Sequence, residues 1–180
     1  WQNTIGGTGS ESVRKIVLAD DGGYLLAGFS TSDISGDKTE IAYGIGTDYW
    51  VVKINSGGAI LWQNDIGGMD DDLLMSAEKT TDGGYILGGV SYSGLSGDKT
   101  ENSMGGGDYW VVKIDDSGNL EWQNAMGGST SDEGRTITQT LDGGFVMSGF
   151  SESDISGDKT ESNIGPPDTY DYWAVKLYGE

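Results

Sequence analysis

The sequence contains no cysteine, no histidine and only two prolines among its 180 residues. Without cysteine there are no disulfides, thiolate nucleophiles or cysteine-ligated zinc clusters, and without histidine the commonest general base and transition-metal ligand is missing. No apolar run approaches the roughly 18 residues that a membrane-spanning helix needs. Any chemistry that the chain performs must therefore rely on carboxylates.

Positive charge is scarce as well. The chain has 10 lysines and arginines against 29 aspartates and glutamates, which gives a formal net charge of −19. Such a charge repels phosphate backbones and anionic lipid headgroups, so we expect neither nucleic acid nor membrane insertion. Cations and neutral polymers are the favoured partners. With 35% hydrophobic residues, the chain is nevertheless predicted to fold.

Glycine is abundant, with 32 residues, and much of it lies in repeated segments. WQNTIGG at 1–7 returns as WQNDIGG at 62–68 and as WQNAMGG at 122–128, a period of 61 and then 60 residues. SGDKTE occurs unchanged at 35–40, 96–101 and 156–161. A period of this length is typical of propellers and other repeat arrays. We predict one repeat domain over 1–180, with units at about 1–61, 62–121 and 122–180.

Short runs of β-branched and aromatic residues, bounded by glycine, aspartate and serine, predict strands rather than helices. In the first unit they predict four antiparallel strands at 12–19, 24–30, 49–55 and 59–66, with the DGG at 21–23 forming a tight turn. The same pattern in each unit gives about twelve strands. The predicted fold class is all-β, with three four-stranded repeats resembling the blades of a β-propeller.

The order of strands at the two ends predicts how the array closes. Trp1–Ile5 corresponds to the fourth strand of a unit, whereas the final strand, at 172–177, corresponds to the third. Pairing between them, within one chain or between two copies, would remove two exposed sheet edges. We therefore expect the N-terminal strand to close the last blade. A β-trefoil, which also has threefold symmetry, is the structural alternative.

The segment SGDKTENSMGGGDYWVVKIDDSGNLEWQNAMGG at 96–128 resembles a repeat found in large secreted and cell-surface proteins of Bacteroidetes, which are often substrates of type IX secretion. The resemblance covers all three units. It implies propeller-like blades and an extracellular or cell-surface location. Because closed propellers have four to eight blades, three units suggest either a homo-oligomer, two chains forming a six-bladed ring, or part of a longer chain.

The SGDKTE segment admits two interpretations. Its alternating oxygen-bearing residues imitate a calcium loop, in which a hard cation gathers six to eight oxygen ligands. The candidate metal ligands are Asp33, Asp37, Glu40, Asp98, Glu101, Asp154, Asp158 and Glu161. In the other interpretation the segment is a structural turn, with aspartate capping backbone amides, glycine permitting the bend and lysine paired with glutamate.

Antiparallel order predicts that the long loops share one face with the loops that join successive units. That face carries a second recurring acidic position: Glu11, Asp72 and Asp132. Paired carboxylates are also the apparatus of glycoside hydrolases, but an active site needs its acid and base once rather than three times. Tyr43 and Tyr92 break the repeat near these loops and are candidates for stacking on sugar rings. The repeated tryptophans are best explained by packing between blades.

These observations favour an extracellular, non-enzymatic module for adhesion or ligand binding, with a glycan or a surface protein as partner and calcium as a candidate stabilising ion. The alternatives are a carboxylate-dependent polysaccharide hydrolase and a structural spacer of a surface filament.

Overall fold

The computed structural model describes residues 1–178, which form eleven β-strands and no helix. Within this part of the chain, therefore, no helix is long and apolar enough to cross a membrane. The strands are β1 (Glu11–Leu18), β2 (Tyr24–Ser30), β3 (Asp48–Ile54), β4 (Ile60–Ile66), β5 (Asp72–Lys79), β6 (Tyr85–Ser91), β7 (Asp108–Ile114), β8 (Leu120–Met126), β9 (Asp132–Gln139), β10 (Phe145–Ser151) and β11 (Asp171–Leu177). The strand bounds predicted for the first unit are confirmed to within one residue.

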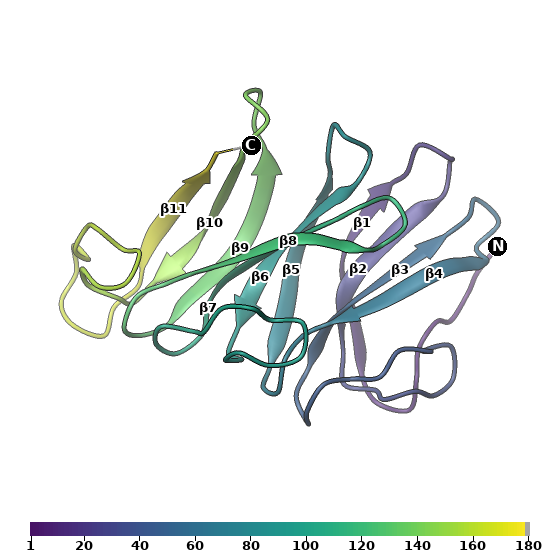
Figure 1. Ribbon diagram of the computed structural model, residues 1–180, viewed down its shortest axis with the longest axis horizontal. Helices are drawn as coiled ribbons and strands as arrows, with labels where there is room; N and C mark the ends of the chain where they lie inside the picture. Colours follow the sequence, from purple (N-terminus) through teal and green to yellow (C-terminus); the bar gives the residue numbers. More distant parts are fainter. Residues whose placement is uncertain (179–180) are drawn as a thin grey trace.

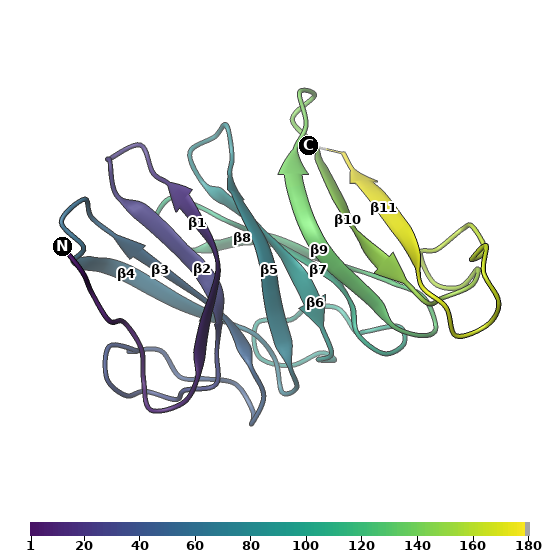
Figure 2. The same cartoon turned by 180° about the vertical axis from the view of Figure 1, so that it is seen from behind.

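The strands form three separate antiparallel sheets, each a meander of consecutive strands. We call them blade 1 (β1–β4), blade 2 (β5–β8) and blade 3 (β9–β11). Figure 1 shows the three sheets stacked side by side as a fan, and Figure 2 shows the first strands β1, β5 and β9 adjacent on the reverse side. Contacts of β1 with β5 and of β5 with β9 agree with this view. The blades are propeller-like, and the trefoil alternative is not observed.

Tight glycine turns set the length of the first hairpin in each blade. The amide of Gly22 donates to the carbonyl of Ala19 at 3.1 Å, and Gly22 has a φ of 78°. Gly83 and Gly143 occupy the same turn in the other blades, with φ of 97° and 84°. Because residues with a Cβ rarely adopt a positive φ, the DGG segments fix the positions of these turns.

The hydrophobic core lies between blades. Tyr49 and Val51 of blade 1 pack against Leu87 and Trp110 of blade 2, and an equivalent cluster joins blade 2 to blade 3. Trp110 is fully buried, with its ring centroid 4.8 Å from that of Tyr49. The predicted packing role is thus confirmed for this tryptophan. A single blade cannot bury its apolar faces alone, which is why the unit is repeated.

The order of strands predicts that Trp1–Ile5 pairs with the last strand, within one chain or between two copies. Among residues 1–178, this pairing does not occur within one chain. Residues 1–5 form no strand and lie against blade 1, whereas β11 lies at the other end of the fan and, in the part of the chain that the structure describes, pairs with β10 alone. Three blades do not bend far enough to bring these ends together. Among residues 1–178, blade 3 therefore has three strands, and the sheets do not close into a ring.

Candidate functional site

Strand pairing places two sets of loops at one end of the blades. Ser30 lies opposite both Glu11 and Asp48, so β2 ends where β1 and β3 begin. The β2–β3 and β4–β5 connections therefore leave the same end, as do their counterparts in the other blades. We call this end the long-loop face; it comprises residues 6–10, 31–47, 67–71, 92–107, 127–131 and 152–170.

Each SGDKTE segment opens with a tight turn. In the first unit Ser35 and Lys38 exchange two backbone hydrogen bonds, of 3.1 and 2.9 Å, around Gly36, whose φ is 56°. Gly97 and Gly157 repeat this conformation with φ of 56° and 54°. The glycine is required by the turn, as the structural interpretation of the segment predicts.

The turn is also fastened to the glycine pair that follows the WQN segment. The backbone amide of the turn aspartate donates to a glycine carbonyl over 2.8–2.9 Å in every unit: Asp37 to Gly6, Asp98 to Gly67, and Asp158 to Gly127. The second and third turns therefore dock onto the end of the preceding sheet, and the first docks onto the N-terminal segment in the same way.

The lysine of each turn points into the protein. Lys38, Lys99 and Lys159 are only 1%, 3% and 5% exposed. Nζ of Lys38 donates to the carbonyl of Ser32 at 2.6 Å, and Nζ of Lys159 donates to the carbonyl of Ser153 at 2.8 Å. The lysine is thus an internal cation that ties the loop to the strand end. This corrects the interpretation in which it pairs with the glutamate of its own segment.

In blade 1 the lysine meets a buried pair of carboxyl groups. Nζ of Lys38 lies 2.5 Å from Oδ2 of Asp65. Burial raises the pKa of Asp48 to about 8, and the negative charge of Asp65 raises it too. Burial raises the pKa of Asp65 to about 6, opposed by its hydrogen bond to Lys38. Ala125 takes the position of Asp65 in blade 2, so this pair belongs to one blade only.

A hydrolase would need a carboxyl pair that occurs in one unit, as this pair does. It would also need the pair to be accessible to substrate. Asp48 and Asp65 are 0% and 5% exposed, beneath the loops. A polysaccharide chain cannot reach a carboxyl group that is closed off from solvent. The pair therefore bears on stability, and the hydrolase alternative gains no support from it.

The aspartate that opens each third strand fastens the end of the long loop. Its Oδ2 atom accepts a loop amide over 2.5–2.7 Å: Tyr43 to Asp48, Met104 to Asp108, and Ile164 to Asp171. These carboxylates therefore cap the loop.

The acidic residues at the start of the first strand of each blade also form hydrogen bonds with loop residues. Oδ2 of Asp72 accepts hydrogen bonds from the amide of Gly68 at 2.7 Å and from the hydroxyl of Ser93 at 2.9 Å. Asp132 makes the same two contacts in its own unit, and Glu11 accepts from the equivalent serine hydroxyl. Their role in ligand binding stays a prediction.

The candidate calcium ligands are spread over the three loops. Six of the eight accept hydrogen bonds from backbone amides: Asp33, Asp37, Asp98, Glu101, Asp154 and Asp158. Within residues 1–178, no group of three or more acidic side chains is arranged to hold a metal ion. Calcium binding stays a prediction.

The two candidate tyrosines occupy different positions. Tyr43 covers the next unit's turn: a Cβ at Gly97 would lie 2.9 Å from the Tyr43 ring. The Tyr92 ring is 40% exposed and lies over Gly107, where a Cβ would approach it to 2.7 Å. Burial and the charge of Glu133 raise the pKa of Tyr92, so its hydroxyl is protonated at neutral pH. Tyr92 also lines a cavity.

That cavity lies on the long-loop face, between blades 1 and 2, and has a volume of about 550 Å³. We call it the loop-face pocket; its lining residues are Ile45, Gly46, Met69, Asp70, Asp71, Tyr92, Gly105 and Gly106. The carboxylate of Asp71 accepts the amide of Thr47 at 2.9 Å, and the carbonyl of Asp71 accepts the amide of Tyr92 at 2.9 Å. These bonds join the three loops that form the pocket.

The pocket residues other than Tyr92 were missed at the level of sequence. Residues 69–71 read MDD, whereas the matching residues read TGS at 8–10 and STS at 129–131. Tyr92 likewise stands where the other units have Thr31 and Glu152. A comparison of the units for positions that differ, rather than for those that repeat, would have found these residues.

A larger hollow, of about 750 Å³, opens at the opposite end of blades 2 and 3, beside Trp122 and Asn124. In the preceding blade the equivalent residues are covered, because Trp62 and Asn64 donate to carbonyls of the β7–β8 turn at 3.2 and 2.8 Å. The described part of blade 3 has no fourth strand and no such turn. The hollow therefore lies where a neighbouring turn covers the equivalent residues of the preceding blade, and we do not treat it as a candidate site.

Comparison with known proteins gives few relatives. No family model matches the sequence. The chain is 28% identical over 181 residues to the regulatory protein FlaEY of Caulobacter vibrioides, a match that covers 94% of this chain and 18% of that protein. The chain thus spans about a fifth of the length of this curated relative.

Among solved structures, a protein of unknown function from Bacteroides caccae is similar, with 12% identity and a TM-score of 0.33 over 77% of this chain and 53% of that one. A likeness of this degree carries no argument about function. The resemblance to Bacteroidetes repeat proteins accordingly stays a prediction.

Proposed function

We propose that this chain is a non-enzymatic, extracellular binding module that holds a neutral glycan in the loop-face pocket. The proposal depends on one observation: the exposed ring of Tyr92 lies in the same cavity as the exposed carboxylates of Asp70 and Asp71. The extracellular location is inferred from the resemblance of the repeats.

The chemistry of the pocket suits a polyhydroxylated ligand. An exposed aromatic face can stack on the apolar face of a sugar ring, while the edge of the ring remains wet. The carboxylates of Asp70 and Asp71 can accept hydrogen bonds from sugar hydroxyls, and a charge-assisted acceptor makes a stronger bond than a neutral one. Gly105 and Gly106 complete the wall of the pocket, and the Gly106 amide holds it in place by donating to the carbonyl of Thr130 at 2.9 Å.

The charge of the protein decides against anionic ligands. A net charge of −19 repels sulfated or uronic-acid polymers, and both pocket carboxylates would face them directly. Neither the net charge nor the pocket carboxylates repel a neutral glycan. Between a glycan and a protein partner, a concave pocket of this volume favours the smaller ligand.

The distribution of constant and variable residues supports the same proposal. The SGDK turns, the capping aspartates and the buried lysines recur in every unit and make the scaffold. The pocket lining instead takes residues that differ between units, which is how rigid scaffolds commonly present binding loops. A purely structural spacer has no need of such residues on one face.

The test is a glycan array with the labelled protein, followed by calorimetric titration of the best neutral hit. We expect Tyr92→Ala to weaken binding by about tenfold or more, because a buried aromatic contact is commonly a dominant one. Glu152→Ala, at the equivalent position of blade 3, is the matched control and should leave affinity unchanged. Thermal melts would show that both variants fold.

Three outcomes would contradict the proposal. Absence of neutral glycan binding would favour the spacer alternative, and equal losses in the two variants would place the ligand elsewhere. Release of shortened products from the bound glycan, detected by chromatography, would favour the hydrolase.

A further inference from the structure

The buried lysine of blade 1 has different partners from the lysines of blades 2 and 3. In blade 2, Nζ of Lys99 donates to the hydroxyl of Ser103, in the same loop, at 3.1 Å. In blade 3, Nζ of Lys159 donates to Oδ1 of Asn163, at the equivalent position, at 2.5 Å. Blade 1 has Ala42 at this position, and its side chain accepts no hydrogen bond. The lysine of blade 1 therefore needs another partner.

Blade 1 supplies a carboxyl group instead, from Asp65 of β4. Nζ of Lys38 lies 2.5 Å from Oδ2 of Asp65, and the two side chains are 0% and 1% exposed. Oδ1 of Asp65 is buried without a hydrogen-bond partner. The equivalent residues are Ala125 in blade 2 and Thr4 in the N-terminal segment. The loss of the loop partner and the gain of a carboxyl group thus occur together in one blade.

A second carboxyl group adjoins this pair. Trp50 pairs with Asp65 across β3 and β4. Because side chains two residues apart on a strand point to the same face, Asp48 lies diagonally beside Asp65. The amide of Tyr43 donates to Oδ2 of Asp48 at 2.7 Å and fixes the orientation of this carboxyl group. With its pKa raised to about 8, Asp48 keeps its proton at neutral pH, next to the buried ion pair.

The surroundings disfavour charge on either partner of the ion pair. Burying two opposite charges costs more than their attraction returns unless the remaining lone pairs accept hydrogen bonds. Transfer of one proton from Nζ of Lys38 to the carboxylate of Asp65 gives a neutral amine in contact with a carboxylic acid. A neutral lysine amine is a nucleophile. Contact also replaces concentration, since well-oriented groups in one molecule reach effective molarities of about 10⁵–10⁸ M.

We propose that Lys38 and Asp65 condense to an amide, which cross-links the SGDKTE loop of blade 1 to β4. Nζ of Lys38 attacks Cγ of Asp65, a bond forms between them, and the bond from Cγ to one carboxyl oxygen breaks. Asp48 gives a proton to that oxygen, which leaves as water, and recovers a proton from the nitrogen. One ammonium and one carboxylate thus become one amide and one water, with no oxidant, reductant or cofactor.

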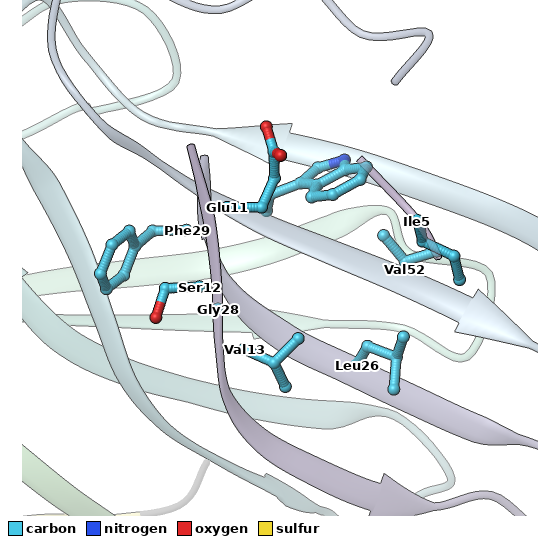
Figure 3. Close-up of a pocket in the computed structure, with 9 residues that line it drawn as sticks. Ile5, Glu11, Ser12, Val13, Leu26, Gly28, Phe29 and Val52 are labelled. Atoms are coloured by element: carbon cyan, nitrogen blue, oxygen red, sulfur yellow. The ribbon is translucent and has the colours of Figure 1, made fainter. Parts of the chain in front are cut away.

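The site also excludes the water that would reverse the reaction. Lys38, Asp48 and Asp65 are all buried. A hollow of about 130 Å³ beside β1 and β3, with Glu11 and Leu26 in its wall, is shown in Figure 3; none of the three reacting residues lines it. The amide carries no charge, so the cost of keeping an ion pair away from water disappears once the bond has formed.

The cross-link would act as a disulfide does in other proteins, in a chain that has no cysteine. It joins residues 38 and 65 and so restricts the unfolded chain between them. Until the bond forms, both carboxyl groups remain ionisable. The pKa values of Asp48 and Asp65 therefore belong to the unlinked chain, which is recognised by its full mass, and the pH dependence of stability is a property of that form.

Mass spectrometry of the denatured 180-residue chain is the first test. We expect folded wild type to be one water molecule lighter than its sequence. Trypsin does not cleave after an acylated lysine, so a digest should contain residues 16–53 joined to residues 54–79. Fragmentation of this product should place the junction at Lys38 and Asp65. An aspartate that cyclises on its own backbone also loses one water, but it yields no joined peptides.

Variants separate the two reacting groups from the proton carrier. Lys38→Met and Asp65→Ala should both keep the full mass. Asp48→Asn retains the shape and an oxygen for the loop amide but cannot carry the proton. In samples taken at intervals after cell-free synthesis, its linked fraction should form about 100-fold more slowly than in wild type. Asp20→Ala breaks the exposed ion pair with Lys79 and, as the matched control, should link like wild type.

Folded wild type that keeps its full mass through prolonged incubation would overturn the proposal, and this measurement needs no variant. Loss of water without joined peptides would overturn it as well. Linkage of Asp48→Asn at the wild-type rate would remove Asp48 from the mechanism. None of these results depends on glycan binding, because none of the three residues lines the loop-face pocket.

Discussion

Replacing Asp65 with alanine, the residue that blade 2 has at this position, should flatten the dependence of stability on pH. In the folded protein burial raises the pKa of Asp65 to about 6, from an ordinary value of 3.8. Between these values the folded state binds more protons than the unfolded state. The free energy of unfolding is therefore highest in acid and decreases as the pH rises from about 4 to about 6. Two pH units correspond to about 3 kcal/mol.

Because of Asp48, the free energy of unfolding continues to decrease at higher pH. Its pKa is raised to about 8, by burial first and by the charge of Asp65 second. Removing Asp65 also lowers the pKa of Asp48, which can then ionise and pair with Lys38. Between pH 4 and pH 8, wild type should thus lose at least about 3 kcal/mol more than the variant. In melting temperature the difference is about 6–12 °C for a chain of this size.

Urea denaturation at steps across this pH range, at constant ionic strength, measures the effect directly. Constant ionic strength matters because the net charge of −19 adds a pH dependence of its own. Asp33→Ala removes an exposed carboxylate instead and should leave the slope unchanged. Parallel slopes for wild type and Asp65→Ala would refute the reasoning.

Three further predictions follow from the long-loop face. Lys99→Met leaves the buried hydroxyl of Ser91 without its donor and removes the cation near the carboxyl groups of Asp72 and Asp108, so it should cost about 2 kcal/mol or more. Lys79→Met breaks a partly exposed ion pair and should cost at most about 1 kcal/mol; equal losses by urea denaturation would contradict this. Gly97 and Gly143 both have a positive φ, but a Cβ at Gly97 would lie 2.3 Å from a backbone carbonyl and one at Gly143 would meet nothing within 4 Å. Gly97→Ala should therefore lower the melting temperature more than Gly143→Ala. If the acidic loops bind calcium, millimolar calcium should raise the melting temperature more than magnesium at equal ionic strength; equal shifts would indicate screening alone.

The strands and their order could be predicted from the sequence because their causes are local. Turn glycines such as Gly22 must adopt a positive φ, and alternating apolar residues must face another sheet, so repeated letters mark repeated hairpins. Antiparallel connectivity then sorts the loops between the two ends. None of these steps requires knowledge of distant contacts.

The role of the lysine in SGDKTE could not be obtained in this way. In the sequence Lys38 follows Asp37 and lies two positions before Glu40, so a surface pairing with Glu40 is the nearest explanation. In the structure it is buried against Ser32 and Asp65, which are 6 and 27 positions away. Burial depends on how the loop docks onto the neighbouring strands, and no local pattern encodes that.

The repeat by itself determined the blade, its strands, its turns and the face on which the long loops gather. Tertiary structure alone decided which loop residues meet. The loop-face pocket combines residues from three loops, Gly46, Met69 and Tyr92 among them, and it exists only where two blades pack at a particular angle. The positions of the two ends also depend on tertiary structure: Trp1–Ile5 corresponds to the fourth strand of the repeat and β11 to the third, and three blades separate them. The sequence carries the local conformations, whereas distances between separate sheets depend on the sum of all packing contacts between them.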